Sequence, residues 1–170
     1  NVQDTKTSDD IWVADLEAKA EPRARPFLAT MDFEQMPAFA PDGQAIAYTA
    51  LESGSFEVYV RRFPEGDQKV RVSTDGGMGP QWSRDGSELF YQSLDGGKLF
   101  AVSVRKNTGL SFGAPRVLFE GPYLPSIDLG PSYAVSPDGR RFLMTRKPNL
   151  FPLRATELVV VQNWFEDVRR

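Results

Sequence analysis

Apolar and polar residues alternate with a period of two along most of the chain, and Asp-Gly pairs interrupt the alternation at repeated positions. The stretch "FAPDGQAIAYTA" begins at Phe39, "WSRDGSELFYQS" at Trp82 and "VSPDGRRFLMTR" at Val135. In each copy an apolar residue stands three positions before the Asp, and others stand four and six positions after it. This alternation on both sides of a tight turn predicts a β-hairpin. Asp-Gly suits the turn because glycine accepts a positive φ and the Asp side chain bonds nearby backbone.

Each hairpin is followed by a third apolar run, and a fourth short run follows three of these third runs. The third runs are residues 57–60, 98–102 and 157–161, with an additional member at 10–16, and the fourth runs are residues 25–30, 69–74 and 115–120. The repeating unit is therefore four strands, a to d, in which the Asp-Gly turn joins strands a and b. Four-stranded units that recur every ~40–50 residues are typical of β-propeller blades. We expect an all-β fold, a β-propeller fragment of four-stranded antiparallel blades.

The strands add up to about three blade-equivalents. We expect strands c and d of a partial blade in residues 1–35, complete blades in 36–78 and 79–121, and strands a, b and c with a C-terminal tail in 122–170. A short helix is expected at residues 162–170. Propellers have roughly 4–8 blades around a channel, so three cannot close a ring. The chain is then expected to be part of a longer one, or to form a homodimer of about six blades in which two copies complete each other's partial blades.

The repeated residues have a structural interpretation. We interpret six residues as structural turn residues: Asp42, Gly43, Asp85, Gly86, Asp138 and Gly139. We expect the aromatic residues of the strands to pack between blades, as aromatic side chains do in stacked sheets, and not to form a ligand cage. These aromatic residues are Trp12, Phe39, Tyr48, Tyr59, Trp82 and Tyr91.

Composition narrows the chemistry of the 170-residue chain. It has 41% hydrophobic residues, a net charge of −3, and neither Cys nor His, so thiol nucleophiles and histidine bases are excluded. Interspersed charges argue against nucleic-acid binding, and no apolar run is long enough for membrane insertion of this segment. The composition does not exclude catalysis by a pair of carboxylates, as in glycosidases, but the turn aspartates are expected to lie far apart around a ring. We expect no enzymatic activity, no cofactor and no metal site.

The three hairpins resemble the TolB-type WD-like propeller repeat. In addition, "DIWVADL", "EVYVRRFP", "PRVLFEGPYL" and "LVVVQNWFEDVRR" resemble, in the same order, the C-terminal half of the propeller of bacterial serine/threonine kinases of the eukaryotic type. The resemblance implies an extracytoplasmic location, periplasmic or at the cell surface. The kinase motifs "HRD" and "DFG" are absent from the sequence, so the resemblance does not imply kinase activity for any residue of this chain.

The function expected from these observations is a non-catalytic protein-interaction or ligand-sensing module, with a protein or peptide ligand. The alternative is an accessory substrate-gating propeller of a peptidase, or a free TolB-like periplasmic protein. Binding residues are expected in the connecting loops, at residues 52–56, 75–79 or 123–131. The last loop is preferred because it is long and apolar; its candidate residues are Tyr123, Leu124, Pro125, Ile127 and Leu129. It could instead pack over the end of its blade. The glycine-rich stretch 73–79 lacks the Lys of a phosphate-binding loop and is expected to be a connection.

Overall fold

The strands of the protein form four antiparallel sheets in the computed structural model, which describes residues 8–16, 23–52, 54–105, 109–127, 130–147 and 158–162. The first sheet contains β1 (Ile11–Asp15) and β2 (Arg23–Leu28). The second contains β3 (Glu34–Phe39), β4 (Ala45–Glu52), β5 (Ser55–Arg62) and β6 (Val70–Arg71). The third contains β7 (Met78–Trp82), β8 (Glu88–Gln92) and β9 (Lys98–Arg105), and both β10 (Ser111–Phe112) and β11 (Arg116–Glu120) pair with β9. The fourth contains β12 (Tyr133–Val135), β13 (Arg141–Thr145) and β14 (Leu158–Gln162).

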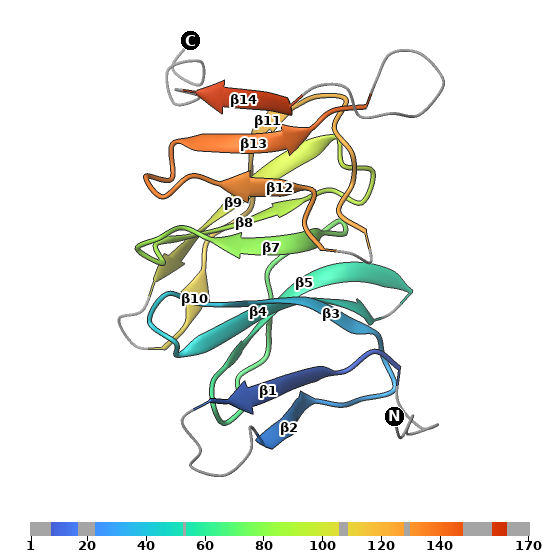
Figure 1. The fold of residues 1–170 in the computed structure, drawn as a ribbon, viewed down its shortest axis with the longest axis vertical. Helices are drawn as coiled ribbons and strands as arrows, with labels where there is room; N and C mark the ends of the chain where they lie inside the picture. The colour runs from blue at the N-terminus through green and yellow to red at the C-terminus, as the bar shows by residue number, and fades with distance from the viewer. Residues whose placement is uncertain are drawn as a thin grey trace.

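The sheets are stacked one after another in chain order, from the first near the N-terminus to the fourth near the C-terminus (Figure 1). Within the second sheet the strands run a, b, c, d from one edge to the other, as the sequence predicts. The expected d strand at 69–74 is shorter than predicted, with two residues in β6. The helix expected at 162–170 lies outside the described residues except for Gln162, which ends β14.

The hydrophobic core lies in the three interfaces between adjacent sheets. We call the face of a sheet that meets the following sheet its forward face, and the opposite face its backward face. Between the first and second sheets the buried residues are Ile11, Leu28, Tyr48, Ala50 and Tyr59. Between the second and third they include Ala45, Ala47, Val58, Val60, Leu89, Tyr91 and Val102. Between the third and fourth they include Phe90, Leu99, Ala101, Tyr133, Phe142 and Met144. In each interface, a forward face therefore packs on a backward face.

The two middle sheets are covered on both faces, whereas the end sheets are covered on one. All residues of β4 from Ala45 to Ala50 are buried, although successive side chains of a strand point to opposite faces. In β13 the burial alternates: Phe142 is fully buried, whereas its neighbour Leu143 is 41% exposed. β1 behaves in the same way, with Ile11 4% and Trp12 56% exposed. Among the described residues, each end sheet therefore carries exposed side chains on one of its faces.

Two of the aromatic residues expected to pack between blades are exposed instead. Trp12 is 56% and Phe39 is 53% exposed, whereas Tyr48, Tyr59 and Tyr91 are buried as expected. Phe39 pairs with Ile46 on the backward face of the second sheet. The first sheet packs on Tyr48 and Tyr59, whereas the ring of Phe39 meets that of Phe63 edge-on, with centroids 5.1 Å apart. Trp82 is half-buried, and its indole N–H donates to the carbonyl of Ala38 at 3.1 Å, which ties the third sheet to the second.

The three Asp-Gly turns have the same geometry. The Oδ1 atoms of Asp42, Asp85 and Asp138 each accept a hydrogen bond of 3.0 Å from the backbone N–H two residues later. The glycines that follow have φ angles of 68–69°, which a residue with a Cβ rarely adopts. A fourth such turn, Asp95-Gly96, joins β8 to β9, where the N–H of Gly97 donates to Asp95 at 2.9 Å.

Candidate functional site

The connections of the strands gather at two opposite edges of the stack, because neighbouring strands are antiparallel. We call one the turn edge; it carries the β3–β4, β7–β8 and β12–β13 turns (Figure 1). The other, the loop edge, carries the β4–β5 and β8–β9 hairpins and the connections from one sheet to the next. All three candidate loops of the sequence therefore lie at the loop edge.

The preferred candidate loop is fixed to the third sheet by a buried glutamine. We call residues 121–132 the anchored loop; residues 121–127 and 130–132 of it are described. Gln92 is fully buried at the end of β8, and its Oε1 accepts hydrogen bonds from the Ser126 N–H (3.0 Å), the Ser126 hydroxyl (2.8 Å) and the Ser132 hydroxyl (2.9 Å). Its Nε2 donates to the carbonyl of Leu124 at 3.1 Å. A neutral side chain thus satisfies several buried polar groups of the loop at once.

Glycine at position 96 allows the close approach of the anchored loop to the β8–β9 turn. Gly96 has a φ of 77°, and a Cβ there would lie 2.4 Å from the backbone nitrogen of Pro125. On its other side, the loop begins to pair with the fourth sheet: the N–H of Leu124 donates to the carbonyl of Thr145 at 2.8 Å. The loop is therefore held between two sheets before any ligand binds.

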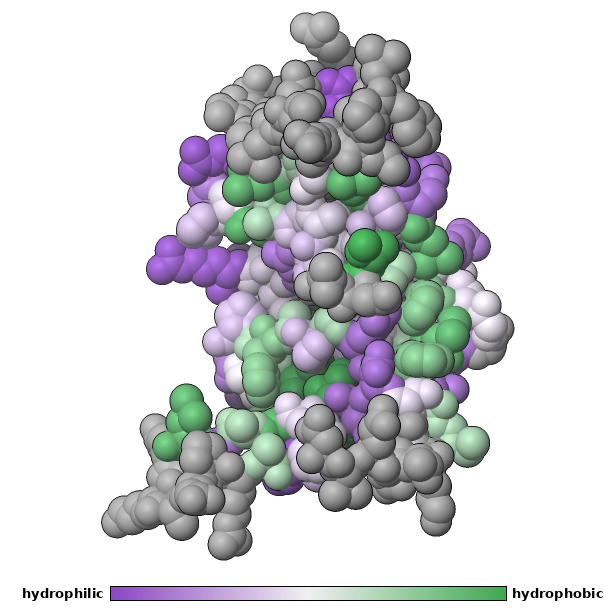
Figure 2. All heavy atoms as spheres, turned by 45° about the vertical axis from the view of Figure 1, so that its right-hand side comes forward, coloured by the Kyte–Doolittle hydropathy of each residue, from purple (hydrophilic) through white to green (hydrophobic). Residues whose placement is uncertain are grey.

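The five candidate residues differ in exposure. Tyr123 is 8% exposed and packs in the core between the third and fourth sheets, and Leu124 and Pro125 are half-buried. Ile127 is 58% exposed and Leu129 lies outside the described residues. Figure 2, in which the loop edge is turned forward, shows hydrophobic residues among hydrophilic ones over the middle of the stack. The anchored loop therefore presents to a ligand the exposed aliphatic side chain of Ile127, on a backbone that hydrogen bonds to Gln92 hold in place.

The glycine-rich stretch 73–79 has no free cradle of N–H groups. The N–H of Gly76 donates to the Glu57 carboxylate at 3.2 Å, that of Gly77 to the carbonyl of Phe56 at 2.9 Å, and that of Gly79 to the Thr49 hydroxyl at 3.2 Å. A phosphate group would need these same donors. This stretch is a connection between the second and third sheets.

At residues 52–56, the other candidate loop, the chain forms a tight β4–β5 hairpin. Glu52 forms an ion pair with Lys69, whose ammonium group lies 4.3 Å from the ring centroid of Tyr59. Gly54 has a φ of 84° and nothing within 4 Å of an added Cβ. The hairpin is short and its charges are paired, so it offers less to a ligand than the anchored loop.

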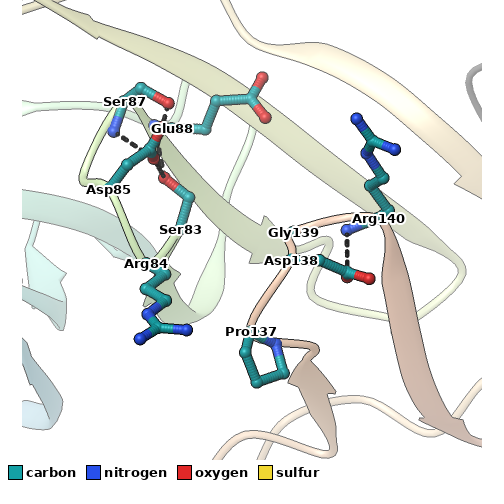
Figure 3. A pocket seen from close by; sticks show the side chains of 9 residues that line it. All are labelled: Ser83, Arg84, Asp85, Ser87, Glu88, Pro137, Asp138, Gly139 and Arg140. Atoms are coloured by element: carbon teal, nitrogen blue, oxygen red, sulfur yellow. Dashed lines mark hydrogen bonds between the residues drawn. The ribbon is translucent and has the colours of Figure 1, made fainter.

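A cleft of about 500 Å³ lies at the turn edge, between the β7–β8 and β12–β13 turns (Figure 3). We call it the turn cleft. It is lined by Ser83, Arg84, Asp85, Ser87, Glu88, Pro137, Asp138, Gly139 and Arg140. Asp85 and Asp138 line the same cleft because adjacent sheets place equivalent turns next to each other, whereas the expected separation of their carboxylates stays a prediction.

The two aspartates of the turn cleft are both poor proton donors. Asp85 accepts hydrogen bonds from the Ser83 hydroxyl (2.7 Å) and from the N–H and hydroxyl of Ser87 (3.0 and 2.8 Å), which lowers its pKa to about 2. Hydrogen bonds from Ser136 and from the Arg140 N–H also lower the pKa of Asp138. A general acid requires a raised pKa, so this pair does not suit glycoside hydrolysis at neutral pH.

The described part of the chain contains neither a candidate metal-binding cluster nor a candidate membrane-spanning helix. Its residues contain no group of three or more His, Cys, Asp or Glu side chains arranged to hold a metal ion. Among the same residues we find no helix with the length and apolar character needed to cross a membrane.

Comparison with known proteins places the chain by its fold. No protein-family model and no curated protein matches the sequence. Among solved structures, a chain of a nidogen–laminin complex superimposes with a TM-score of 0.60 at 14% identity, over 93% of this chain and 60% of that one. TolB from Agrobacterium tumefaciens gives 0.52 at 14% identity, over 90% and 57%. Oligogalacturonate lyase from Vibrio parahaemolyticus gives 0.53 at 14% identity, over 81% and 36%.

These similarities, together with the stacked antiparallel sheets, identify the fold as part of a β-propeller, the fold shared by these structures. At such identities they concern the fold alone. The chain spans between 36% and 60% of the length of these three proteins.

Proposed function

We propose that this chain is a non-catalytic interaction module that binds a protein or peptide through the anchored loop. The observation that carries the proposal is the exposed Ile127 on a loop that Gln92 fixes from below. A preorganised loop loses little conformational entropy on binding, and an exposed apolar side chain gains from burial. Support also comes from the nidogen–laminin structure, in which a chain of similar fold is part of a protein complex.

The absence of catalysis is part of this proposal. Without His or Cys, the chain has neither the usual general base nor a thiol nucleophile, and the lowered pKa values of Asp85 and Asp138 keep these two carboxylates ionised at neutral pH. One protein of similar fold is a lyase for oligogalacturonate, which makes this compound a suitable probe. Turnover of oligogalacturonate or of peptide substrates by the purified chain would contradict the proposal.

A random-peptide display library, selected on the immobilised chain, tests the binding surface. Peptides enriched on the wild-type chain are expected to bind Ile127→Ser roughly tenfold more weakly, which corresponds to about 1.4 kcal/mol. Val117→Ser is the matched control, because Val117 is a 41% exposed aliphatic residue on β11, outside the anchored loop. Enriched peptides that bind both variants as well as the wild type would reject the anchored loop as the site.

We also propose that the chain is the C-terminal propeller part of a kinase-like bacterial receptor, on the extracytoplasmic side. This rests on the resemblance of the motifs and on the TolB-like fold. The coding sequence upstream of Asn1 provides the test. A kinase domain followed by a membrane span is expected there, whereas a secretory signal would favour the free TolB-like protein, and a peptidase domain the gating propeller.

Finally, we propose that two copies of the chain associate as a homodimer. The first and fourth sheets have two and three described strands, whereas the middle sheets have four and five. Incomplete sheets with open faces favour association because they leave apolar surface exposed. Sedimentation equilibrium at micromolar concentration is expected to give the mass of two chains.

A further inference from the structure

We infer that the turn cleft is a second binding surface, which takes an acidic peptide segment through the arginines Arg84 and Arg140. The cleft lies between the β7–β8 and β12–β13 turns at the turn edge, opposite the loop edge that carries the anchored loop. This surface is separate from the one in the proposed function, because it binds by ion pairs and not by burial of an apolar side chain.

The geometry of the turns does not require an arginine at either position. Counted from the turn aspartate, Pro41 of the first hairpin stands at the position of Arg84. Gln44 of the same hairpin stands at the position of Arg140. That first turn has the same 3.0 Å hydrogen bond to its aspartate and a glycine φ of 69°, so proline and glutamine build the turn equally well. Residues that the local fold does not explain are expected at functional sites.

The carboxylates of the turn cleft already have partners within the chain. Asp85 accepts three hydrogen bonds inside its own turn. Asp138 forms an ion pair with Arg141 at 3.2 Å, and Glu88 forms one with Arg116. These three acidic side chains therefore do not need Arg84 or Arg140 for their stability.

The guanidinium groups of Arg84 and Arg140 form no ion pair or hydrogen bond with the part of the chain that the structure describes. Figure 3 shows the two side chains on opposite turns, with dashed lines that hold the aspartates and none that reaches a guanidinium group. Both arginines are exposed. Hydrogen bonds from Ser136 and the Arg140 N–H are the larger causes of the lowered pKa of Asp138, and the charge of Arg140 is a smaller one. Both guanidinium groups thus keep their donors for a ligand.

Positive charge exceeds negative charge at the turn cleft. With the ion-pair partners Arg116 and Arg141 included, four arginines stand against three carboxylates. A guanidinium group binds a carboxylate through two parallel hydrogen bonds, so two arginines on opposite turns suit a ligand with two carboxylates. Exposed ion pairs are individually weak, which means that a ligand has to form more than one of them.

The size and lining of the cleft favour a peptide. Its volume of about 500 Å³ exceeds what one small anion fills, and falls within the range of ligand pockets. Among the described residues, the lining includes no aromatic side chain on which a nucleobase could stack. A short run of Asp or Glu residues supplies several carboxylates on a flexible chain that follows such an open surface.

Fluorescence anisotropy with labelled peptides of six glutamates or six glutamines tests the inference. Wild type is expected to bind the glutamate peptide and not the glutamine peptide, and added salt should weaken this binding. Arg84→Pro and Arg140→Gln give each turn the residue of the first turn, so circular dichroism should be unchanged. Each is expected to weaken binding roughly three- to fivefold, and the double variant at least about tenfold. If Arg84→Pro folds poorly, Arg84→Gln takes its place with the same expected loss.

Arg62→Gln is the matched control for the loss of one positive charge. Arg62 is also an exposed arginine, and it lines a separate hollow of about 320 Å³ beside the first turn. This variant is expected to bind the glutamate peptide like the wild type. An equal loss in Arg62→Gln, or an unchanged affinity in the double variant, would overturn the inference, as would equal binding of the two peptides to the wild type.

Two further results separate this surface from other ligands and from the anchored loop. Ile127→Ser is expected to bind the glutamate peptide like the wild type, because Ile127 lies at the opposite edge. A loss of binding in this variant would contradict two separate surfaces. Tighter binding of oligogalacturonate than of the glutamate peptide, lost in the double variant, would reject a peptide as the ligand and assign an acidic saccharide to the cleft.

Discussion

Replacement of Gln92 by leucine tests how the anchored loop is held. Leucine keeps the buried volume of the side chain but removes its amide, so the Ser126 N–H and the Ser126 hydroxyl lose their shared acceptor. The Ser132 hydroxyl, which lies near both Gln92 Oε1 and the Leu124 carbonyl, keeps the Leu124 carbonyl as its acceptor at 2.6 Å and is therefore not orphaned. Two orphaned donors cost roughly 1–3 kcal/mol each, so we expect the free energy of unfolding to fall by roughly 2–6 kcal/mol.

Urea denaturation followed by circular dichroism measures this change. Gln44→Leu is the control, because Gln44 is exposed in a turn and its replacement should change stability by less than about 0.5 kcal/mol. Hydrogen exchange adds a local measurement: the Ser126 amide is expected to be protected in the wild type and to exchange faster in Gln92→Leu. If both variants unfold at the urea concentration of the wild type, the anchoring role of Gln92 is refuted.

Three further changes test other parts of the structure. Gly96→Ala is expected to lower the free energy of unfolding by more than about 2 kcal/mol because its Cβ would clash with Pro125, whereas Gly43→Ala, with the same kind of φ but open space, should cost about 1 kcal/mol. Gln68→Gly should raise stability by roughly 0.5–1 kcal/mol in the same assay, since Gln68 is exposed with a φ of 48°. The pKa of Asp85 is lowered from 3.8 to about 2, so its contribution to stability is present above pH 3.8 and is lost as the pH falls toward 2. The free energy of unfolding of Asp85→Asn, measured in urea, should therefore depend less on pH in this range than that of the wild type. An unchanged pH dependence would contradict the role of the hydrogen bonds to Asp85.

The sequence predicts the hairpins well because their determinants are local. Because side chains alternate along a strand, the residues four and six positions after each turn aspartate point to the same face of the sheet, and the residue between them points to the other face. The Asp-Gly turn sets the pairing register of the two strands. The residues concerned are at most 1% exposed: Ile46, Tyr48, Leu89, Tyr91, Phe142 and Met144. The fourth Asp-Gly turn, at Asp95, was open to the same reasoning, since "SLDG" repeats the pattern of "SRDG".

The site was less accessible to sequence reasoning because its contacts are distant in the chain. Gln92 is a polar residue at the end of an apolar strand, which was the available signal, but its partner Ser126 lies 34 residues away. The exposure of Trp12 and Phe39 depends on which neighbouring strands are present, and an alternating pattern does not carry that information. By contrast, the position of Asp85 and Asp138 on one cleft could have been predicted, because equivalent turns of consecutive blades are neighbours.

Hydrogen–deuterium exchange with a selected display peptide tests the proposed function most directly. The peptide is expected to slow exchange in the anchored loop, residues 121–132, and to leave the turns at 83–88 and 136–141 unchanged. Protection at those two turns, with unchanged exchange in the anchored loop, would contradict the proposal and place binding in the turn cleft.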